Sequence, residues 1–337
     1  MHALVTGGGG FLGQYIVEQL LARGDSVRIF ARGAYPELAA RGVETVRGNI
    51  CDALQISAAC RGIDVVFHTA SLPGISVKRC PFYQTNVLGT ENVLAACREH
   101  GIDRFVYTSS PSVTDGGKEQ CGIDESTPYP ERYLAWYPET KAVAEKIVLQ
   151  ANGTVLSNGK ILATCALRPR LIWGPNDRQL IPRLLQRART CQLSQVGDGT
   201  NLLDITYVEN AAAAHLSAAD CLVPGAPVAG NAYYLSQGEP VNCWEWINKI
   251  LQMVELPPIR RKVTFKTAWR AGLFFETVYS FLRLNGEPPM TRFLATQLAQ
   301  SYWFKIDRAK KDFGYQPLIS TEEGLQRLAE DFKKRYR

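Results

Sequence analysis

The sequence contains no apolar run long enough to cross a lipid bilayer, so a membrane-spanning protein is not expected. Its nine cysteines are scattered and form no Cys-x-x-Cys pair, which favours free thiols in a reducing cytoplasm over disulfides or bound zinc. The four histidines lack the spacing of metal ligands, so we expect no metal site. No repeat, low-complexity segment or nucleic-acid-binding motif is present, and the first residues already have a strand pattern. Neither a nucleic-acid partner nor a signal peptide is therefore expected.

The bulk composition is that of a globular protein with a sizeable core. Of the 337 residues, 46% are hydrophobic and 21% are charged, and a chain of this length folds as one large domain or as two. The net charge of +6 is partly concentrated around residues 260–270 and in the C-terminal tail. Such clusters are most often a solvated surface; an anionic ligand or an anionic lipid surface is the functional alternative.

The N-terminal segment has the pattern of a strand, a glycine turn and a helix. An apolar run over residues 2–5 precedes Gly7, Gly10 and Gly13, and an amphipathic run over residues 11–22 follows. A side chain within such a turn would collide with a pyrophosphate or hold the helix away from the strand. Because backbone N–H groups at the start of a helix attract phosphate, the pattern predicts a dinucleotide at this turn.

The first two-thirds of the chain alternate between strand-like and helix-like segments. Strands are predicted over 2–6, 26–30, 43–47, 63–68, 103–108 and 161–167, and helices over 11–23, 53–60, 84–100, 137–151 and 208–220. Strand alternating with helix predicts an α/β fold with a doubly wound parallel sheet of the Rossmann type.

Beyond Pro169, prolines divide the chain into shorter segments, which predict a smaller, mostly helical domain over the carboxyl ends of the strands. Capping patterns indicate helices that begin near Asn242 and near Ser320. We expect the nucleotide-binding domain to comprise residues 1–170 and 193–220, and the substrate-binding domain to comprise residues 171–192 and 221–337.

Tyr137 and Lys141 lie four residues apart at the start of a predicted helix, on one face of it. A phenol with a pKa of about 10 is a poor acid or base at neutral pH, but a neighbouring ammonium lowers that pKa. The pair is a candidate general acid–base for a carbonyl/alcohol couple, although a surface helix pair has the same spacing. Ser110, after the fifth predicted strand, is a candidate to hydrogen-bond a substrate carbonyl, and we expect its serine neighbours to cap backbone groups.

These motifs resemble those of the extended short-chain dehydrogenases/reductases over nearly the whole chain. Besides the glycine turn, Ser110, Tyr137 and Lys141, the matching segments are Asn86–Thr90, Leu167–Pro175, Val196–Gly199 and Tyr207–Asn210. The segments Tyr107–Val113, Tyr137–Lys141 and Cys165–Arg170 resemble the 3β-hydroxysteroid dehydrogenase branch. Within that branch, residues 168–187, 197–215 and 284–300 resemble the 2-alkyl-3-oxoalkanoate reductases of bacterial olefin biosynthesis.

The resemblance implies roles for individual residues. Tyr137 would exchange the proton, Lys141 would hold the ribose and tune Tyr137, and Ser110 would bind the carbonyl. Asn86 would support this network, whereas we expect a structural role for His68. The residues expected at the cofactor are Gly7, Gly10, Phe11, Leu12, Gly13, Arg32, Asn49, Ile50, Thr69, Ala70, Lys141, Pro169 and Ile172.

The end of the second predicted strand indicates which dinucleotide is bound. An NAD-dependent enzyme has an acid there for the adenosine ribose, whereas this chain has Ala31 and Arg32. Arg32 could pair with a 2′-phosphate, although a solvated arginine fits the same pattern, and Arg28 is expected to face elsewhere. NADP(H) is therefore favoured over NAD(H). Asn49 stands where the family usually has an acid at the adenine, and its amide can still hydrogen-bond there.

Residues 266–284 carry most of the information about the substrate. They are predicted to form a helix with an apolar face that comprises Leu273, Phe274, Val278, Phe281 and Leu282. Core packing is the default interpretation of such a face; the alternatives are a lid over a long apolar substrate and contact with a membrane surface. The basic residues at 260–270, or Arg170 and Arg178 from the other side of the site, would suit a carboxylate on that substrate.

We therefore expect an NADPH-dependent reductase of a ketone on a large apolar substrate, by resemblance the 3-oxo group of a 2-alkyl-3-oxoalkanoate. The alternatives are an NAD-dependent 3β-hydroxysteroid dehydrogenase, a sugar-nucleotide epimerase or dehydratase, and a non-catalytic NADP sensor. The aromatic residues of 266–284 argue against a diphosphate clamp, and the presence of Tyr137 argues against a sensor. We expect a cytoplasmic protein, with peripheral membrane contact as an option. By resemblance it is a homodimer joined through the helices near 84–100 and 137–151.

Overall fold

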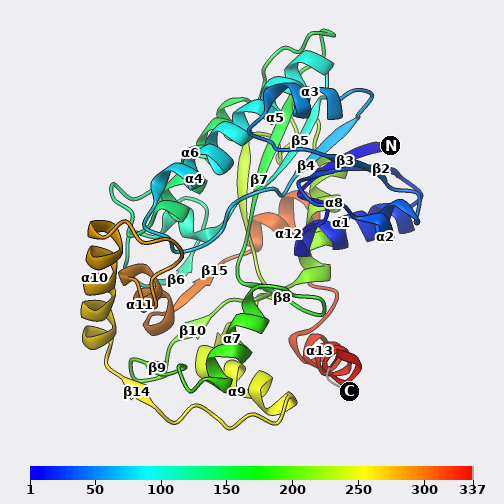
Figure 1. The fold of residues 1–337 in the computed structure, drawn as a ribbon. Helices are drawn as coiled ribbons and strands as arrows, with labels where there is room; N and C mark the ends of the chain where they lie inside the picture. Colours follow the sequence, from blue (N-terminus) through cyan, green and yellow to red (C-terminus); the bar gives the residue numbers. More distant parts are fainter. Residues whose placement is uncertain (336–337) are drawn as a thin grey trace.

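A computed structural model describes residues 1–335, and its largest feature is a seven-stranded parallel sheet (Figure 1). The strand order is β3-β2-β1-β4-β5-β7-β12. The strands are β1 (His2–Thr6), β2 (Ser26–Ala31), β3 (Glu44–Arg47), β4 (Val65–His68), β5 (Arg104–Thr108), β7 (Ala163–Pro169) and β12 (Asn231–Leu235). The first six of these strands lie where the sequence predicts them.

Helices cover both faces of this sheet. One face packs against α1 (Phe11–Ala22), α8 (Val208–Cys221) and α12 (Asp307–Phe313), with the short α2 (Pro36–Ala39) at its margin. The other face packs against α3 (Ala53–Ala59), α5 (Gly89–His100) and α6 (Trp136–Gln150). Central strands are apolar on both sides, as Val65, Val66 and Phe67 illustrate, because neither face meets water. The predicted α/β fold with a doubly wound sheet is confirmed.

A smaller part of the molecule contains a second sheet, in the order β13-β10-β15-β6, and five helices (Figure 1). Its strands are β6 (Gln120–Ile123), β10 (Leu202–Leu203), β13 (Val241–Asn242) and β15 (Tyr302–Phe304). Two strand pairs join it, β8 (Ile172–Trp173) with β11 (Thr206–Tyr207) and β9 (Gln195–Val196) with β14 (Lys262–Val263). The helices are α7 (Leu180–Arg189), α9 (Cys243–Met253), α10 (Phe265–Phe281), α11 (Arg292–Ala299) and α13 (Thr321–Arg335).

Both predicted helix starts in this part are confirmed by their caps. The Asn242 side chain accepts hydrogen bonds from the backbone N–H groups of Trp244 and Glu245 at the start of α9. The Ser320 hydroxyl accepts one from the N–H of Glu323 at the start of α13. Each cap satisfies N–H groups that have no partner within the first helical turn.

The boundary between the two parts differs from the expected one. β12 is the edge strand of the large sheet and α12 packs beside it, although both lie within residues 221–337. Conversely, β6 and the strands β9 and β10 belong to the small sheets, although they lie within residues 1–170 and 193–220. The reason is that strand pairing joins segments far apart in sequence, as in the pair β15 and β6, and a local pattern does not reveal such partners.

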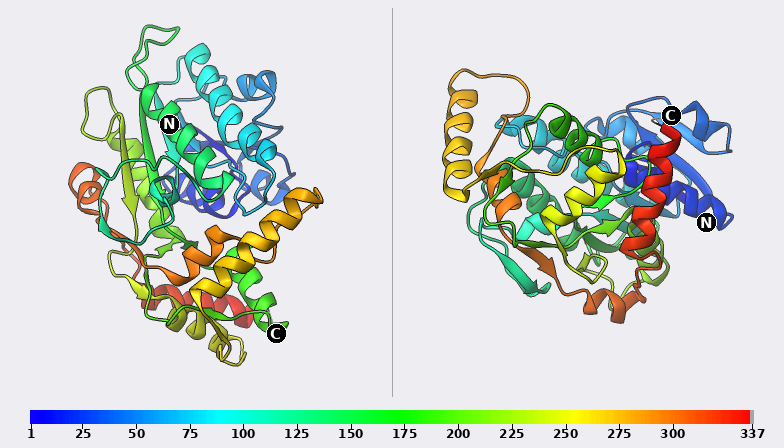
Figure 2. Two further views of the ribbon diagram at one scale, coloured as in Figure 1. Left: turned by 90° about the vertical axis from the view of Figure 1, so that its left-hand side faces the viewer. Right: turned by 90° about the horizontal axis from the view of Figure 1, so that it is seen from below.

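The helix expected over residues 266–284 is α10, but its apolar face does not pack into the core. Phe274 is 62% exposed and Phe281 is 84% exposed, whereas only Ala268 and Gly272 of α10 are buried. In Figure 1 and in the right-hand view of Figure 2 the helix stands at the outer edge of the molecule. The default interpretation of this face as core was therefore wrong. Within residues 1–335 no helix has both the length and the apolarity that crossing a bilayer requires.

Candidate active site

Tyr137 and Lys141 occupy the first turns of α6, beside the carboxyl end of β5. The Lys141 ammonium donates a hydrogen bond of 2.5 Å to the backbone oxygen of Thr108, the last residue of β5. It also lies 4.1 Å from the centre of the Tyr107 ring. Lys141 is only 2% exposed, and this burial lowers its pKa to about 7, a shift that the nearby Glu145 carboxylate partly opposes.

Ser110 lies directly after β5 and faces Tyr137. Its hydroxyl shares a hydrogen bond of 2.9 Å with the hydroxyl of Ser112 and caps the short 3₁₀ helix Pro111–Thr114. Burial raises the pKa of Tyr137, while a hydrogen bond with Ser110 and the positive charge of Arg170 oppose the rise. The groups that act on the pKa of Tyr137 do not include Lys141, whose ammonium is hydrogen-bonded to Thr108. The Tyr137 phenol consequently keeps its proton at neutral pH.

Asn86 connects three segments around these residues. It lies in a π-helical turn over Tyr83–Leu88 that follows the short helix α4 (Arg79–Phe82). Its amide accepts a hydrogen bond from the N–H of Leu72 and donates one to the oxygen of the same residue. The amide also donates to the Thr140 hydroxyl, 3.1 Å away, and that hydroxyl bonds back to the start of α6. Asn86 thus fixes the loop after β4 against the helix that carries Tyr137.

A buried ion pair that the sequence analysis did not identify lies under this site. Glu145, one turn beyond Lys141 on α6, accepts hydrogen bonds of 2.9 Å and 2.6 Å from Arg168 on β7. Both side chains are almost completely buried, and the Arg168 guanidinium lowers the pKa of Glu145 against the effect of burial. The sequence signal that could have revealed it is the spacing of Tyr137, Lys141 and Glu145, each four positions after the one before.

The glycine turn after β1 has the shape that a dinucleotide requires. A Cβ on Gly13 would lie 2.4 Å from the carbonyl oxygen of Gly7, and a Cβ on Gly7 would lie 3.0 Å from the backbone of Ala70. Helix α1 begins at Gly10 without a side-chain cap and without an acid in its first turn. The N–H groups at its start, including those of Phe11 and Leu12, therefore suit an anionic phosphate.

Other residues expected at the cofactor line the same edge of the sheet. The Thr69 hydroxyl donates to the oxygen of Thr6, which draws the end of β4 against the end of β1. His68 lies between the hydroxyls of Thr6 and Thr90, and burial lowers its pKa to about 3, so it is neutral and structural. Pro169 ends β7, and Ile172 begins β8 three residues later.

Two arginines, not one, lie at the ends of β2 and β3. Arg32 is exposed just after β2, and the Arg47 side chain donates a hydrogen bond of 3.0 Å to its backbone oxygen. The pairing of Ala31 with Arg47 in the sheet brings the two together, a contact that the sequence alone does not reveal. Arg28 pairs with Glu44 and so faces elsewhere, as expected. Nearby, Asn49 is exposed and Ile50 is buried against α5.

Arg170 is a buried cation at the border between the two parts of the molecule. It is only 7% exposed, donates one hydrogen bond of 2.8 Å to Gln297 and lies over the Tyr302 ring. Within residues 1–335 it forms no ion pair, and its Nε atom has no hydrogen-bond partner. Two buried acids, Asp204 and Asp115, act on its charge from a distance, and burial raises the pKa of Asp204 to about 6 and raises that of Asp115. Arg178, by contrast, is exposed.

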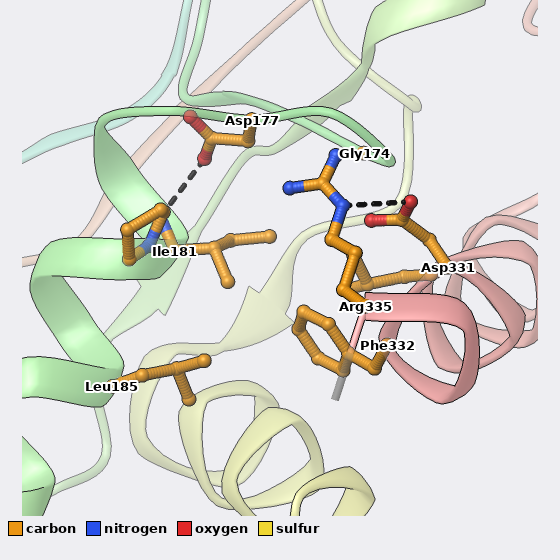
Figure 3. Close-up of a pocket in the computed structure, with 9 residues that line it drawn as sticks. Gly174, Asp177, Ile181, Leu185, Asp331, Phe332 and Arg335 are labelled. Carbon is orange, nitrogen blue, oxygen red and sulfur yellow. Dashed lines mark hydrogen bonds and ion pairs between the residues drawn. The ribbon is translucent and has the colours of Figure 1, made fainter. Parts of the chain in front are cut away.

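A shallow pocket between α7 and α13 lies apart from these residues (Figure 3). Its Asp177 carboxylate accepts hydrogen bonds from the first N–H groups of α7, and its Arg335 pairs with Asp331 at 3.0 Å. No residue expected at the cofactor or at the reacting carbonyl lines it. Within residues 1–335 no cluster of His, Cys, Asp or Glu side chains could hold a metal ion.

Comparison with known proteins matches residues 4–265 to the 3-beta hydroxysteroid dehydrogenase/isomerase family. The chain is 50% identical to a 2-alkyl-3-oxoalkanoate reductase of Stenotrophomonas maltophilia, over 97% of this chain and 98% of that protein. It is 32% identical to the decarboxylating sterol-4-alpha-carboxylate 3-dehydrogenase of Mus musculus, over 97% and 90% of the two chains. A Thermus thermophilus UDP-glucose 4-epimerase in complex with NAD has the same fold, with a TM-score of 0.75, 22% identity and 99% of each chain covered.

The lowered pKa of Lys141 predicts a pH-dependent stability. Between about pH 7 and the ordinary lysine pKa of about 10.5, the folded chain binds fewer protons than the unfolded chain, so stability rises with pH. We expect the free energy of unfolding of the cofactor-free protein to rise from about pH 7 to about pH 9 relative to that of Lys141→Met. Urea denaturation at both pH values measures this change in the free energy of unfolding. Lys146→Met, an exposed lysine of the same helix, should keep the wild-type slope; a Lys141→Met profile parallel to wild type would contradict the assignment.

Proposed function

The chain belongs to the 3-beta hydroxysteroid dehydrogenase/isomerase family, and we propose that it is an NADPH-dependent reductase of a ketone on a large apolar substrate. As a member of this family it is an NAD(P)-dependent oxidoreductase with a small-molecule substrate. The proposed substrate is a 2-alkyl-3-oxoalkanoate, which is reduced to the 3-hydroxy acid. The observation that carries this proposal is the buried cation of Arg170 beside Tyr137.

The chain's own residues account for the proton side of the reaction. When bound, the dinucleotide supplies the hydride that reduces the carbonyl carbon. The Ser110 hydroxyl donates a hydrogen bond to the carbonyl oxygen, and the Tyr137 phenol donates its proton to the same oxygen as negative charge develops there. The product alcohol carries that proton, and the Tyr137 phenolate regains one from solvent. The raised pKa of Tyr137 suits this direction, because the phenol is protonated before each turnover.

Lys141 and Asn86 have supporting roles in this proposal. Lys141 would exchange its bond with Thr108 for the ribose hydroxyls of the dinucleotide and bring positive charge near the phenolate. Asn86 holds the start of α6, through Thr140, at a constant position relative to the loop after β4. The glycines at 7, 10 and 13, with Thr69 and Ala70, would hold the pyrophosphate side of the cofactor.

Arg170 would bind the carboxylate of the substrate. In a 3-oxo acid the carboxylate is separated from the ketone by one carbon, so both groups can be held at once only if cation and phenol are close neighbours. The positive charge of Arg170 acts on Tyr137, and we propose that the two side chains lie close enough to hold both groups. Its free Nε and its buried, weakly compensated charge favour an incoming anion. Two relatives are named for carboxylate-bearing substrates of this kind, the oxoalkanoate and the sterol-4-carboxylate.

NADP(H) is the proposed cofactor. The 2′-phosphate would lie beyond the carboxyl end of β2, where Arg32 and Arg47 stand and the acid of NAD-dependent enzymes is missing. The Arg47 side chain and Arg32 are in contact there, and a doubly charged phosphate could pair with both guanidinium groups.

We further propose a cytoplasmic homodimer in peripheral contact with a membrane. The dimer would form through α5, α6 and the preceding π-helical turn, where Leu88 is 40% exposed. A substrate with long alkyl chains partitions into lipid, so contact with a bilayer would place the enzyme beside its substrate.

Replacement of Tyr137 by Phe tests the proton donor. The variant keeps the ring and loses only the hydroxyl, so we expect kcat to fall by about 10²–10⁴-fold while NADPH still binds. NADPH oxidation with a 3-oxoalkanoate measures turnover, and nucleotide fluorescence measures binding. Turnover close to wild type would remove the mechanism. Rapid NAD-linked oxidation of sterols by the wild type, without reduction of 3-oxo acids, would instead support the steroid alternative.

Replacement of Arg170 by Gln tests the carboxylate site. We expect kcat/KM for a 3-oxoalkanoate to fall by roughly 10–100-fold, because a hydrogen bond to a charged group contributes about 1.5–3 kcal/mol. The same variant should lose much less activity toward the methyl ester, which carries no charge. Arg178→Gln, at an exposed arginine, serves as the matched control. An equal loss with acid and ester would show that Arg170 acts on the fold and not on the substrate.

Replacement of both Arg32 and Arg47 by Ala tests cofactor choice. We expect the Kd of NADPH to rise by roughly tenfold or more and that of NADH to stay nearly constant, since only NADPH carries the 2′-phosphate. Titration of the purified protein with each nucleotide measures both constants. Arg41→Ala, another exposed arginine nearby in the chain, is the control. If the wild type bound NADH as tightly as NADPH, the preference would be wrong.

A further inference from the structure

The outward side of α10 and the residues after it expose a continuous set of apolar side chains, which we name the α10 apolar face. Its members and their exposed fractions are Leu273 (41%), Phe274 (62%), Phe281 (84%), Leu282 (57%) and Leu284 (38%). The opposite side of the helix is closed, because a Cβ on Gly272 would come 2.5 Å from the backbone N of Arg292. Helix α11 therefore covers one side of α10 and leaves the apolar face in contact with water.

Exposed cations precede α10, lie on it and follow it along the chain, and we name this set the basic rim. It consists of the exposed residues Arg260, Arg261, Lys262, Lys266, Arg270 and Arg283. Within residues 1–335 none of these six forms an ion pair, and the single acid of α10, Glu276, is turned inward to Arg292 at 2.6 Å. Apolar side chains bordered by uncompensated cations are the combination that an anionic lipid surface attracts.

The chain after α10 lies against the loop that borders the candidate active site. The Lys78 ammonium donates a hydrogen bond to the Asn285 side chain, and the Ile75 N–H donates one of 3.0 Å to Glu287. The same loop is bonded to Asn86 through Leu72 and to Trp136, the residue before Tyr137, through Val77. The residues that follow α10 are therefore bonded to the loop that borders the candidate active site.

We propose that the α10 apolar face and the basic rim bind the surface of an anionic lipid bilayer. The apolar side chains enter the interface between headgroups and acyl chains, and the cations pair with lipid phosphates. A second copy of this chain is a poorer occupant, because a symmetric contact would bring two basic rims together without acids between them. The large exposed fractions of Phe274 and Phe281 show that the face does not cover the site as a closed lid in this structure. The inference rests on the proposed peripheral location and not on the proposed reaction.

Vesicle sedimentation of the full chain tests this surface. We expect the wild type to sediment with phosphatidylcholine vesicles that contain phosphatidylglycerol, and to be released by salt, but to bind pure phosphatidylcholine weakly. The double variant Phe274→Ser/Phe281→Ser should bind at least about tenfold more weakly, because two large apolar side chains no longer enter the interface. Lys266→Gln/Arg270→Gln should weaken binding to the anionic vesicles by roughly tenfold and leave binding to pure phosphatidylcholine unchanged.

Leu54→Ser/Leu318→Ser is the matched control, since these leucines are 84% and 77% exposed at other places on the surface. This variant should bind vesicles like the wild type. Equal binding by the Phe274/Phe281 variant and the wild type, or no preference for anionic vesicles, would overturn the proposal. Light scattering without lipid tests whether a second copy of this chain binds the face instead. If the wild type were an oligomer and the Phe274/Phe281 variant a smaller species, α10 would be an interface between copies. Reduction of a short, water-soluble 3-oxo acid by the same variant keeps this result separate from a failure of the proposed reaction.

Discussion

The buried ion pair between Glu145 and Arg168 is the interaction on which the rest of the site depends. It joins α6 to β7 in the interior, with 0% of the Glu145 side chain and 3% of the Arg168 side chain exposed. Its two hydrogen bonds hold α6 against β7 of the sheet. Lys141 stands one turn earlier on that helix, and Arg170 lies two residues after Arg168, just beyond the end of β7. Breaking such a pair costs about 3–5 kcal/mol, because an uncompensated charge is left behind. The position of α6 relative to β7 can therefore change little.

Arg168 and Arg170, near the end of β7, differ in how their positive charges are compensated. Arg168 makes two hydrogen bonds to the Glu145 carboxylate, which neutralises its charge inside the protein. Arg170 is equally buried but has one neutral partner, Gln297, and the nearby acids have raised pKa values. Lys141 is likewise buried with only partial compensation. The protein thus holds two buried cations near Tyr137, Arg170 and Lys141. An anionic substrate would pair with the first, and a ribose would hydrogen-bond to the second. The free energy spent on burying these two charges preorganises the site for its ligands.

Helix α10 shows how one pattern can have different structural meanings. An apolar face of this size fits a core helix, a lid or a surface helix equally well, since all three require the same periodicity. The outcome depends on Gly272, which allows α11 to approach one side, and on Glu276, which fixes that side to Arg292. The closed side also holds the partly buried Phe265 and Trp269, whereas Phe274 and Phe281 are turned outward.

The sequence by itself determined the doubly wound sheet, the glycine turn and the positions of Tyr137, Lys141 and Ser110 along the chain. These features are local: each depends on periodicity or on spacing within a few residues, which covalent geometry converts directly into structure. Only the tertiary structure decided that the Arg47 side chain bonds to the backbone of Arg32, that Glu145 pairs with Arg168, that Arg170 is buried over the Tyr302 ring and that β12 completes the sheet. Each of these contacts joins segments that strand pairing or domain packing brings together. The local periodicity of a sequence does not reveal such long-range partners.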